Sequence, residues 1–329
     1  MSNCIIASVP ARLHLGFLDL NGSTGRRFGS LGLPLNEPET LVRLSLANRT
    51  TVEGPDAARA ARHLETLCRH LGINAHHRLE VEHAIPPHIG LGSGTQMAMA
   101  VAAALRRLHG LDTNATDDAT LLGRGSRSGI GIAAFRDGGL IVDAGRRRNE
   151  AEPPVVARHP FPDAWRIILI LDHTNTIGLH GVDEVAAFRA LPPFPVESAA
   201  EICRRVLMQA LPAVVEHDFE AFGDAIEAIQ TAMGTYFAPA QGGLFTSPRV
   251  ERVARGLRQA GAKGIGQSSW GPTGFVFAPS ELDARRFINA VREMAEPGIE
   301  MRVVKGRNTG ARIIEKQLVP VEERARSIR

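Results

Sequence analysis

The sequence predicts an α+β protein built from two domains. Its 329 residues, 44% hydrophobic and 22% charged, are enough for two hydrophobic cores. After a proline-rich passage, "EPPVVARHPFPDAW", the predicted order is strand, helices, strand, strand, helix, strand, which is the ferredoxin-like order. We therefore expect one domain over residues 1–155, a second over residues 156–329, and a cleft between them.

The first half alternates strand and helix patterns. Strand patterns cover residues 4–9, 41–46 and 79–85, and the last one stops at Pro86 because proline cannot donate to a ladder. A long glycine-rich stretch, "PARLHLGFLDLNGSTGRRFGSLGLPL", separates the first two. Residues 54–72 have helical spacing. The segment "TQMAMAVAAALRRLHG" is apolar almost all round, as in a helix buried on most sides, and "GGLIVDAG" is a further strand.

The second half supplies the ferredoxin-like elements. Strands are expected over residues 166–171, on both sides of the turn in "KGIGQSSWGPTGFVFA", and over residues 300–304. Helices are expected at about 197–216, 219–233, 247–260 and 281–294, with a glycine-rich loop, "APAQGGLF", after the second.

Composition excludes several classes of protein. The net charge of +3, short basic runs and only 5% aromatic residues argue against a nucleic-acid surface. Three widely spaced cysteines form neither a disulfide framework nor a zinc site. The N-terminus lacks the pattern of a signal peptide, and the longest apolar run, residues 167–171, is too short to cross a bilayer. We expect a cytoplasmic protein that acts on small molecules, contacts no membrane, and forms a homodimer, the commonest assembly of such enzymes.

The segment "PPHIGLGSGTQ", residues 86–96, is the first candidate site. A glycine-rich turn that leads directly into a helix aims several backbone N–H groups at one point, where the helix dipole adds positive charge. The segment contains no lysine and so is not the common nucleotide loop. The alternative is a helix cap with a flexible start. The candidate anion-binding residues are Gly90, Leu91, Gly92, Ser93, Gly94, Thr95 and Gln96.

Three strings resemble the signatures of the GHMP small-molecule kinase superfamily. "PPHIGLGSGTQMAMAVAAAL" resembles the second signature, whose loop holds the phosphates of ATP in those kinases. "VPARLHLGFLDL" stands at the position of the first signature, and "GAKGIGQSSWGPTGFVF" at that of the third. The resemblance covers most of the chain. It implies a GHMP-kinase-like fold, with an N-terminal part like ribosomal protein S5 domain 2 and a ferredoxin-like C-terminal part.

One departure from the kinases concerns the chemistry. Kinases of this superfamily typically carry S-G-[IV]-D, whose aspartate helps to activate the attacking hydroxyl. Here the corresponding stretch is Ser128-Gly129-Ile130-Gly131. Because glycine cannot accept a proton, ordinary phosphoryl transfer is not expected. A kinase acting on a small alcohol is the rival interpretation, and it would need another carboxylate, for which Asp19 and Asp143 are the candidates.

A narrower resemblance is consistent with the absence of an aspartate at position 131. The strings "ARLHLGFLDLNG", "GRGSRSGIG", "GQSSWGPT" and "GRNTGA" resemble those of the β-ribofuranosylaminobenzene 5′-phosphate synthases. Such enzymes join 4-aminobenzoate, or a close para-substituted benzoate, to phosphoribosyl pyrophosphate with release of CO2 and pyrophosphate, in tetrahydromethanopterin biosynthesis. The resemblance implies a pentosyltransferase that uses Mg2+ with phosphoribosyl pyrophosphate. Since the nucleophile is an electron-rich ring carbon, no strong protein base is required. A non-catalytic nucleotide-binding regulator is the second rival.

The candidate catalytic residues lie in two segments. One or more of Arg12, His14 and Asp19 are expected to contact the 5′-phosphate, the ribose hydroxyls or Mg2+, and the alternative is a solvated arginine and a core histidine. Arg127 lies in the flexible segment "GRGSRSG" together with Arg124 and Ser128. There a guanidinium is suited to gripping phosphate or the benzoate carboxylate in a bidentate manner. The residues that bind the metal ion are not identified.

Further binding candidates come from the remaining glycine-rich turns. Arg26 and Arg27 are suited to folding over an anion, or are simply exposed. Trp270 is expected to stack on an aromatic acid, the alternative being a plug between the domains. "IILILDHTNTIG" resembles the loop of ordinary phosphoribosyltransferases, but His173 replaces the second acid, so we interpret it mainly as a strand. The other candidates are Gln267, Ser268, Ser269, Asn308, Asp172 and His180.

Overall fold

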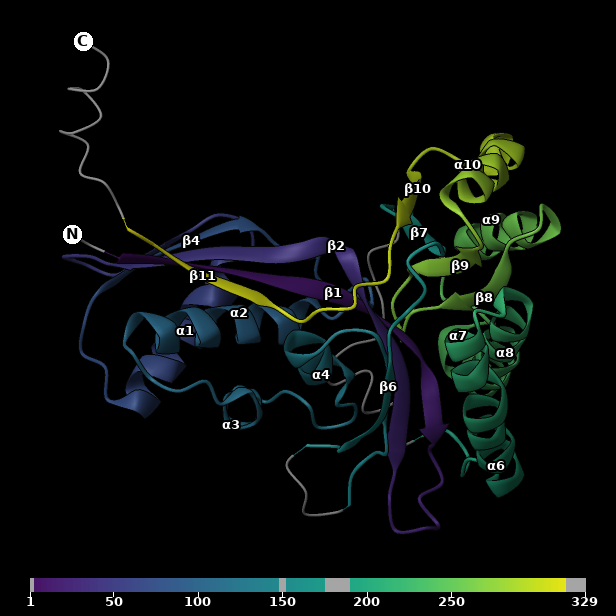
Figure 1. Cartoon of the computed structure of the whole chain (residues 1–329), viewed down its shortest axis with the longest axis horizontal. Coiled ribbons are helices and arrows are strands. Elements are labelled where there is room, and N and C mark those ends of the chain that lie inside the picture. Colours follow the sequence, from purple (N-terminus) through teal and green to yellow (C-terminus); the bar gives the residue numbers. More distant parts are fainter. Residues whose placement is uncertain (1–2, 148–151, 175–189, 318–329) are drawn as a thin grey trace.

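The structure, a computed structural model, describes residues 3–147, 152–174 and 190–317. It contains two sheets with helices packed against them, as the α+β prediction requires (Figure 1). The elements of the first part are β1 (Asn3–Asp19), β2 (Phe28–Leu46), β3 (Thr51–Glu53), α1 (Ala57–Leu71), β4 (His77–His83), α2 (Ser93–Leu108), α3 (Ala115–Leu121), α4 (Ile130–Arg136), β5 (Leu140–Asp143) and β6 (Val155–His159).

The glycine-rich stretch near the N-terminus forms most of a long hairpin, which differs from the prediction. β1 and β2 have 17 and 19 residues and pair in an antiparallel manner from Cys4 with Ser45 to Asp19 with Phe28. Leucines at every second position, such as Leu13 and Leu15, are buried on one face. The glycines therefore interrupt an alternating strand pattern rather than ending it.

The hairpin is bent, and the bend places the site. Register shifts lie between Pro10 and Arg12 and between His14 and Gly16, where Gly16 has a φ of 137°. Such bulges bend a strand and turn side chains to new directions. In Figure 1 the two strands run from the sheet above α1 and α2 down to the helices of the second part.

The buried helix α2 follows the glycine-rich turn. Met97, Ala100, Val101 and Ala104 pack on the sheet and on α1 in one core cluster, while Ala98 and Met99 belong to another core cluster. Because the helix is covered on more than one side, its apolar side chains are buried almost all round, as predicted. Burial holds its first turn rigidly beside β1.

The second part contains a four-stranded antiparallel sheet in the order β10-β7-β9-β8. Its elements are β7 (Arg166–Asp172), α6 (Val196–Arg205), the π-helical turn η1 (Val206–Ala210), α7 (Leu211–Glu216), α8 (Phe219–Gln241), α9 (Pro248–Gln259), β8 (Lys263–Gln267), β9 (Gly274–Ala278), α10 (Glu281–Ala290), the 3-10 turn η2 (Arg292–Met294) and β10 (Ile299–Val304). The predicted ferredoxin-like order is confirmed. However, α8 continues through Ala238–Gln241, which we had assigned to a loop, and it ends at Gly242 with a φ of 86°.

The two faces of this sheet enter different cores. Ile168 and Val276 pack against α9 and α10, whereas Leu169 and Phe275 face α8. The latter core also includes Leu13 and Leu31 of the hairpin. One continuous core therefore joins β1, β2 and α8, so that residues of the two parts are held rigidly against each other.

The chain finally returns to the first sheet. β11 (Arg312–Gln317) pairs with β1 in an antiparallel manner, from Asn3 with Gln317 to Ser8 with Arg312 (Figure 1). The division of the chain at residue 155 stays a prediction, and the pairing shows that residues 312–317 complete the sheet of the first part.

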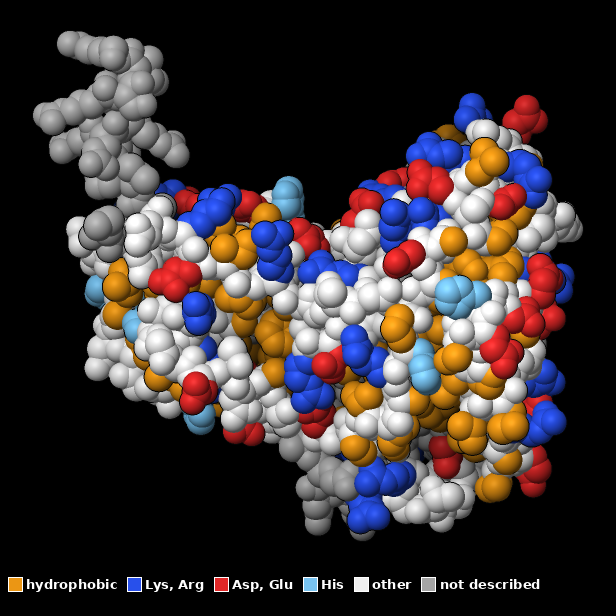
Figure 2. Space-filling model, in the orientation of Figure 1, with side chains coloured by type: hydrophobic (Ala, Val, Ile, Leu, Met, Phe, Trp, Pro, Cys, Tyr) orange, Lys and Arg blue, Asp and Glu red, His pale blue; other side chains and the backbone are white. Residues whose placement is uncertain are grey.

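The surface carries both signs of charge. Figure 2 shows Lys and Arg side chains interspersed with Asp and Glu over the face that it presents. Among the described residues, none of the helices combines the length and the apolarity needed to cross a membrane.

Candidate active site

The glycine-rich turn folds as the sequence predicts. Gly90 and Gly92 have φ values of 87° and 86°, which side chains other than glycine rarely adopt, and Gly92 is the N-cap of α2. The backbone N–H groups of Thr95 and Gln96 both donate to the Gly92 carbonyl at 3.1 Å. The first turn of α2 thus follows directly on the loop, as in anion sites at helix N-termini.

Two other segments clamp this turn. The Arg12 guanidinium donates to the Gly90 carbonyl at 2.5 Å, and the Arg12 backbone N–H donates to the Leu91 carbonyl at 3.1 Å. The Ser268 hydroxyl donates to the same Gly90 carbonyl at 2.9 Å and accepts from the His14 backbone N–H at 3.1 Å. Three strings that are far apart in the sequence therefore interlock at Gly90.

The contact between the glycine-rich turn and the turn at residues 268–271 requires a glycine in each turn. A Cβ on Gly90 would collide with the carbonyl oxygen of Ser268, and a Cβ on Gly271 would collide with the backbone of Ile89 and Gly90. The turn at residues 268–271 also places Ser269, with a φ of 58°, and Trp270. The turn at residues 268–271 therefore contacts the glycine-rich turn and also reaches the pocket beside it.

Two guanidinium groups lie along the turn. A Cβ on Gly92 would lie 3.3 Å from the Arg12 Cζ, and a Cβ on Gly94 would lie 2.8 Å from the Arg124 Nη1. Both glycines therefore allow an arginine to approach the backbone at the start of α2. Together with the helix dipole, the cation at each of these two positions makes it suited to an anion.

A pocket opens beside the turn. It lies between β1, α8 and the turn at residues 268–271. Its lining residues are His14, Gly16, Phe17, Gln230, Met233, Gly234, Phe237, Gln241, Leu244, Gln267, Ser269 and Trp270. The rings of His14 and Phe17 have centroids 4.5 Å apart, and those of Phe237 and Trp270 are 4.4 Å apart. Such a lining suits a flat aromatic ligand.

Glutamine side chains hold the wall of this pocket in place. Gln267 Oε1 accepts from the backbone N–H and the hydroxyl of Thr246, and its Nε2 donates to Gln241 Oε1. Gln230 accepts from the Gln267 backbone N–H at 2.8 Å and donates to the Leu15 carbonyl at 2.8 Å. These amide groups fix the rotamers of the wall and add no charge to it.

His14 brings a buried polar group to the pocket. It is 4% exposed, and its Nε2 atom has no hydrogen-bond partner among the described residues. Burial, followed by the positive charge of Arg12, lowers its pKa to about 3. The imidazole is therefore neutral near pH 7, and its free nitrogen is available to a ligand that enters the pocket.

In the region where kinases carry their aspartate, the described residues place Gly131 and the buried Asp143. Gly131 lies in α4, and a Cβ on it would lie 2.9 Å from the Thr95 Cγ2. Asp143 is fully buried and accepts from the backbone N–H groups of Gly129 at 3.0 Å and Gly145 at 2.9 Å. Burial raises its pKa to about 6, against the effect of these hydrogen bonds. Asp143 thus caps α4 and the turn after β5.

Arg127 and Ser128 lie in the chain between Arg124 and α4. Both are half-buried. The Ser128 hydroxyl donates to Asp143 at 3.4 Å and accepts from the Ile130 backbone N–H at 3.2 Å. Ser128 therefore orders the start of α4, while Ser93, at the first position of α2, is buried with the glycine-rich turn.

Asp19, Arg26 and Arg27 lie at the far end of the hairpin. Asp19 accepts from the backbone N–H groups of Asn21 and Gly22 and so caps the hairpin turn. Arg26 donates to the Gly145 carbonyl at 3.0 Å, and Arg27 donates to the Leu20 carbonyl at 2.9 Å. The structure does not bring these three residues to the glycine-rich turn, and each has another backbone partner.

Asn308 also has a local structural contact. Its Nδ2 donates to the Phe161 carbonyl at 2.9 Å, and its Oδ1 accepts from the Phe161 backbone N–H at 2.7 Å. This pairing ties the segment before β11 to the segment before β7. His180 lies outside the described residues.

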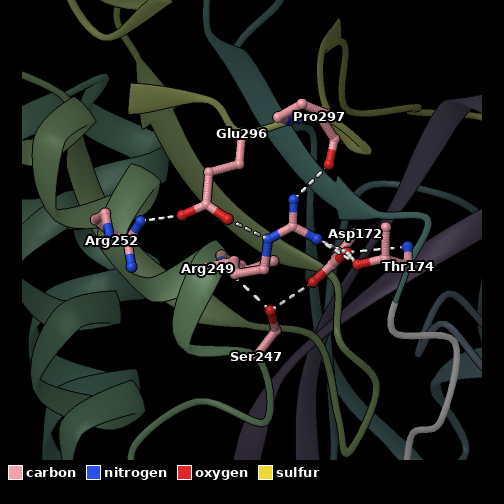
Figure 3. A network of polar contacts seen from close by, with 8 residues as sticks. Asp172, Thr174, Ser247, Arg249, Arg252, Glu296 and Pro297 are labelled. Atoms are coloured by element: carbon pink, nitrogen blue, oxygen red, sulfur yellow. Dashed lines mark hydrogen bonds and ion pairs between the residues drawn. The ribbon is translucent and has the colours of Figure 1, made fainter. Parts of the chain in front are cut away.

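Asp172 closes a separate polar network in the second part (Figure 3). Its carboxylate accepts from the hydroxyls of Thr174 and Ser247 at 2.7 and 2.8 Å and from Arg249 at 3.0 Å. Burial acts to raise its pKa, but these hydrogen bonds and Arg249 lower it below the usual value. Since Ser247 is the N-cap of α9, the network fixes the end of β7 against that helix. His173 pairs instead with Glu300 at 2.8 Å.

The sequence analysis missed several residues of the pocket. Phe17 shares it with His14 because the bulge before Gly16 changes which side chains face it. Gln230, Met233 and Phe237 follow one another on α8 with helical spacing, so they lie on one face. That spacing was visible, but nothing in the sequence showed that this face would meet β1.

Comparisons with known proteins agree with this architecture. Residues 57–139 match the GHMP kinases N terminal domain, and residues 210–296 match GHMP kinases C terminal. A homoserine kinase from Cytophaga hutchinsonii has a similar structure, with a TM-score of 0.69, 20% identity, and 94% of this chain and 97% of that chain covered. A mevalonate diphosphate decarboxylase from Staphylococcus aureus gives a TM-score of 0.65 and 16% identity, over 95% and 98% of the two chains.

Curated relatives narrow the family. A β-ribofuranosylphenol 5′-phosphate synthase of Methanothermobacter thermautotrophicus is 35% identical over 333 residues, covering 94% of this chain and 99% of the relative. One from Archaeoglobus fulgidus is 36% identical over 323 residues, covering 92% and 97%. The expected fold superfamily and the narrower resemblance are thus confirmed. The chain belongs to the β-ribofuranosylphenol 5′-phosphate synthase family, enzymes of glycosyltransferase type with the fold of the GHMP kinases.

Proposed function

We propose that this enzyme joins a para-substituted benzoate to phosphoribosyl pyrophosphate and releases CO2 and pyrophosphate. The observation that carries the proposal is the shared turn at residues 268–271. Ser268 contacts the glycine-rich turn at Gly90, while Ser269 and Trp270 line the aromatic pocket. A phosphate-type loop and a pocket for a flat ring are therefore adjacent, as a reaction between a phosphorylated sugar and an aromatic acid requires.

The diphosphate is placed at the glycine-rich turn. As the bond between ribose C1 and the diphosphate oxygen breaks, negative charge grows on the leaving group and positive charge on the ribose. Backbone N–H groups at the start of α2 and the Arg12 guanidinium stabilise the former. Among the described residues, no group of three His, Cys, Asp or Glu side chains could hold a metal ion. We place Mg2+ on the diphosphate itself, where it would neutralise charge, because Mg2+ usually binds through substrate phosphates and few carboxylates.

The benzoate is placed in the aromatic pocket, with its para substituent at His14. The unpartnered Nε2 of this neutral imidazole accepts a hydrogen bond from an amino or hydroxyl group. That bond increases the electron density of the ring carbon that carries the carboxylate. This carbon bonds to ribose C1, and loss of CO2 returns an electron pair to the ring, so no further proton transfer is needed.

Both 4-aminobenzoate and 4-hydroxybenzoate satisfy this arrangement, because each carries a donor at the para position. The amine is the acceptor that the sequence analysis expects. The curated relatives are named for a phenol, which favours the hydroxyl as the second candidate. Either product has the form of an aryl ribofuranosyl 5′-phosphate, and we propose that it is used in tetrahydromethanopterin biosynthesis.

The test separates this function from that of a kinase. The protein is incubated with Mg2+, phosphoribosyl pyrophosphate and either carboxyl-labelled benzoate, and in parallel with labelled ATP and the unlabelled benzoates. We expect labelled CO2 and pyrophosphate in equal amounts only in the first mixture, and the faster benzoate identifies the acceptor. Formation of ADP without CO2 release would reject the proposal in favour of the kinase. Ligand binding without either product would favour a regulator.

A further inference from the structure

A second group of cations lies near the first turn of α2. Arg124 occupies a turn between two glycines with positive φ, Gly123 at 68° and Gly125 at 77°. Its guanidinium reaches the backbone at Gly94. Arg59 and His63, on α1, lie close enough for their charges to interact with Arg124. This group is distinct from the aromatic pocket, which none of its members lines.

Several buried atoms of this region have no partner among the described residues. They are the Nε of Arg124, the Nε2 of His63, and both side-chain atoms of Gln96 in the first turn of α2. His63 is 7% exposed and Gln96 is fully buried. Because buried polar atoms are nearly always hydrogen-bonded, a concentration of unpartnered ones indicates a site that a polar ligand completes.

The positive charge at this place belongs to Arg124, which forms no ion pair with the described residues, because His63 is neutral near pH 7 and Arg59 is paired with Asp56. Within the described residues, neither Arg124 nor His63 forms an ion pair, and Arg59 pairs only with Asp56, at 3.3 Å. Burial, followed by the charges of Arg124, Arg59 and Arg62, lowers the pKa of His63 to about 4. Burial and then Arg59 also lower the pKa of Arg124. An anion would remove this mutual repulsion.

The two arginines along the glycine-rich turn differ in how they are connected to the pocket. Arg12 is two residues from His14, which lines the pocket, and the Arg12 guanidinium lies beside Gly92. The Arg124 guanidinium lies beside Gly94. Gly92 and Gly94 are at most about 7 Å apart. In a sugar whose C1 faces the aromatic ring, the departing diphosphate is the anion nearest to the pocket. The phosphate on the opposite end of the ribose is the farther one.

We propose that Arg59, His63 and Arg124 form a second anion subsite, which binds the 5′-phosphate of phosphoribosyl pyrophosphate while the diphosphate lies at the glycine-rich turn. This inference rests on the proposed function and adds to it the basis of donor selection. A nucleoside triphosphate has all its phosphates in one chain at one end of the ribose and leaves this subsite without an anion. The subsite thus favours a sugar that is phosphorylated at both ends.

The test uses two small probes, each of which carries one of the two anions. Ribose 5-phosphate and magnesium pyrophosphate are titrated separately into the wild-type protein and into Arg124→Met, by calorimetry. Arg69→Met serves as the matched control, because Arg69 lies on α1 with its side chain 73% exposed and paired with Glu65. Thermal melting of each variant establishes that it is folded. Arg124→Lys, which keeps the charge but not the fork of donors, is measured as well.

Arg124→Met is expected to weaken binding of ribose 5-phosphate by about tenfold or more, the usual effect of losing hydrogen bonds to a charged group. Binding of pyrophosphate should change less than about twofold, and Arg124→Lys should recover part of the loss. The KM for phosphoribosyl pyrophosphate should rise more than kcat falls. Unchanged binding of ribose 5-phosphate, with wild-type protein that still releases CO2, would overturn the subsite alone. Absence of CO2 release by the wild type would instead overturn the proposed function, and the subsite with it.

Discussion

Thr95 occupies the space that a side chain at position 131 would need. Gly131 lies in α4, at the place where the related kinases carry aspartate, and its missing Cβ would be 2.9 Å from the Thr95 Cγ2 in the first turn of α2. Loss of the carboxylate is therefore accompanied by close packing of α4 against α2. The difference from the kinases therefore involves both position 131 and the packing of α4 against Thr95.

Gly131→Asp is accordingly expected not to create a kinase. The new side chain would have to displace Thr95 and would disturb the glycine-rich turn instead of reaching a hydroxyl acceptor. We expect no ADP formation from ATP and a loss of CO2 release, measured with labelled substrates. Phosphorylation of an alcohol by this variant would contradict the assignment of this position.

The packing itself is testable by a double-mutant cycle. Gly131→Ala should lower the free energy of unfolding by about 1–3 kcal/mol, as for other overpacked sites. In a Thr95→Ser background, which lacks the Cγ2, the same change should cost clearly less. Urea unfolding of the four proteins measures both values, and equal costs in the two backgrounds would show that Thr95 is not the neighbour that matters.

Gly90→Ala is expected to disable the turn. Alanine at a φ of 87° is strained, and its Cβ would also collide with the Ser268 carbonyl. Gly72 is the matched control, since its φ is 67° but nothing lies within 4 Å of a Cβ built there. Gly72→Ala should therefore cost only about 1–2 kcal/mol of strain, whereas Gly90→Ala should cost more and abolish binding of magnesium pyrophosphate. Calorimetry that detected normal binding would argue against a diphosphate site at Gly90.

Met233→Trp is expected to fill the aromatic pocket. Met233 lines the pocket and is 5% exposed, so a larger ring there competes with the benzoate. The KM for the benzoate should rise by about tenfold or more, while the KM for phosphoribosyl pyrophosphate changes little, because filling costs about 1–3 kcal/mol in a packed site. Met208→Trp, at a position 67% exposed, is the control. An unchanged benzoate KM would place the acceptor elsewhere.

His14 predicts a definite pH dependence of stability. Its pKa is about 3 in the folded protein against an ordinary value of 6.5, so between these values the unfolded chain binds more protons. Stability contributed through this group is complete above about pH 6.5 and is lost as the pH falls toward 3. In His14→Gln this loss is absent, so the stability difference between wild type and variant should decline by up to about 1.4 kcal/mol per pH unit on acidification. Urea unfolding at about pH 7 and pH 5 measures this difference. If wild type and His14→Gln lost the same stability on acidification, the lowered pKa of His14 would be refuted.

The sequence alone was sufficient for the fold class and for the ferredoxin-like half. The continuous apolar run at residues 167–171 and the helical spacing of the segments that follow it predicted the ferredoxin-like half, because such patterns record which faces are buried. Glycines at 90 and 92 predicted the turn, since positive φ restricts those positions to glycine. Gly131, at the position that the resemblance assigns to the kinase aspartate, argued against kinase chemistry.

Long-range packing decided the rest. The bulge at Gly16 brings Phe17 into the pocket beside His14, and the continuous core of β1 and α8 brings Phe237 and Met233 to the same place. Asp19 and Asn308, which looked equally suitable in the sequence, instead hold the hairpin turn and tie the segment before β11 to the segment before β7. A local pattern specifies which face of an element is apolar, but it does not specify the partner of that face. Which polar side chains share a site therefore depends on contacts between residues hundreds of positions apart, and these exist only in the folded chain.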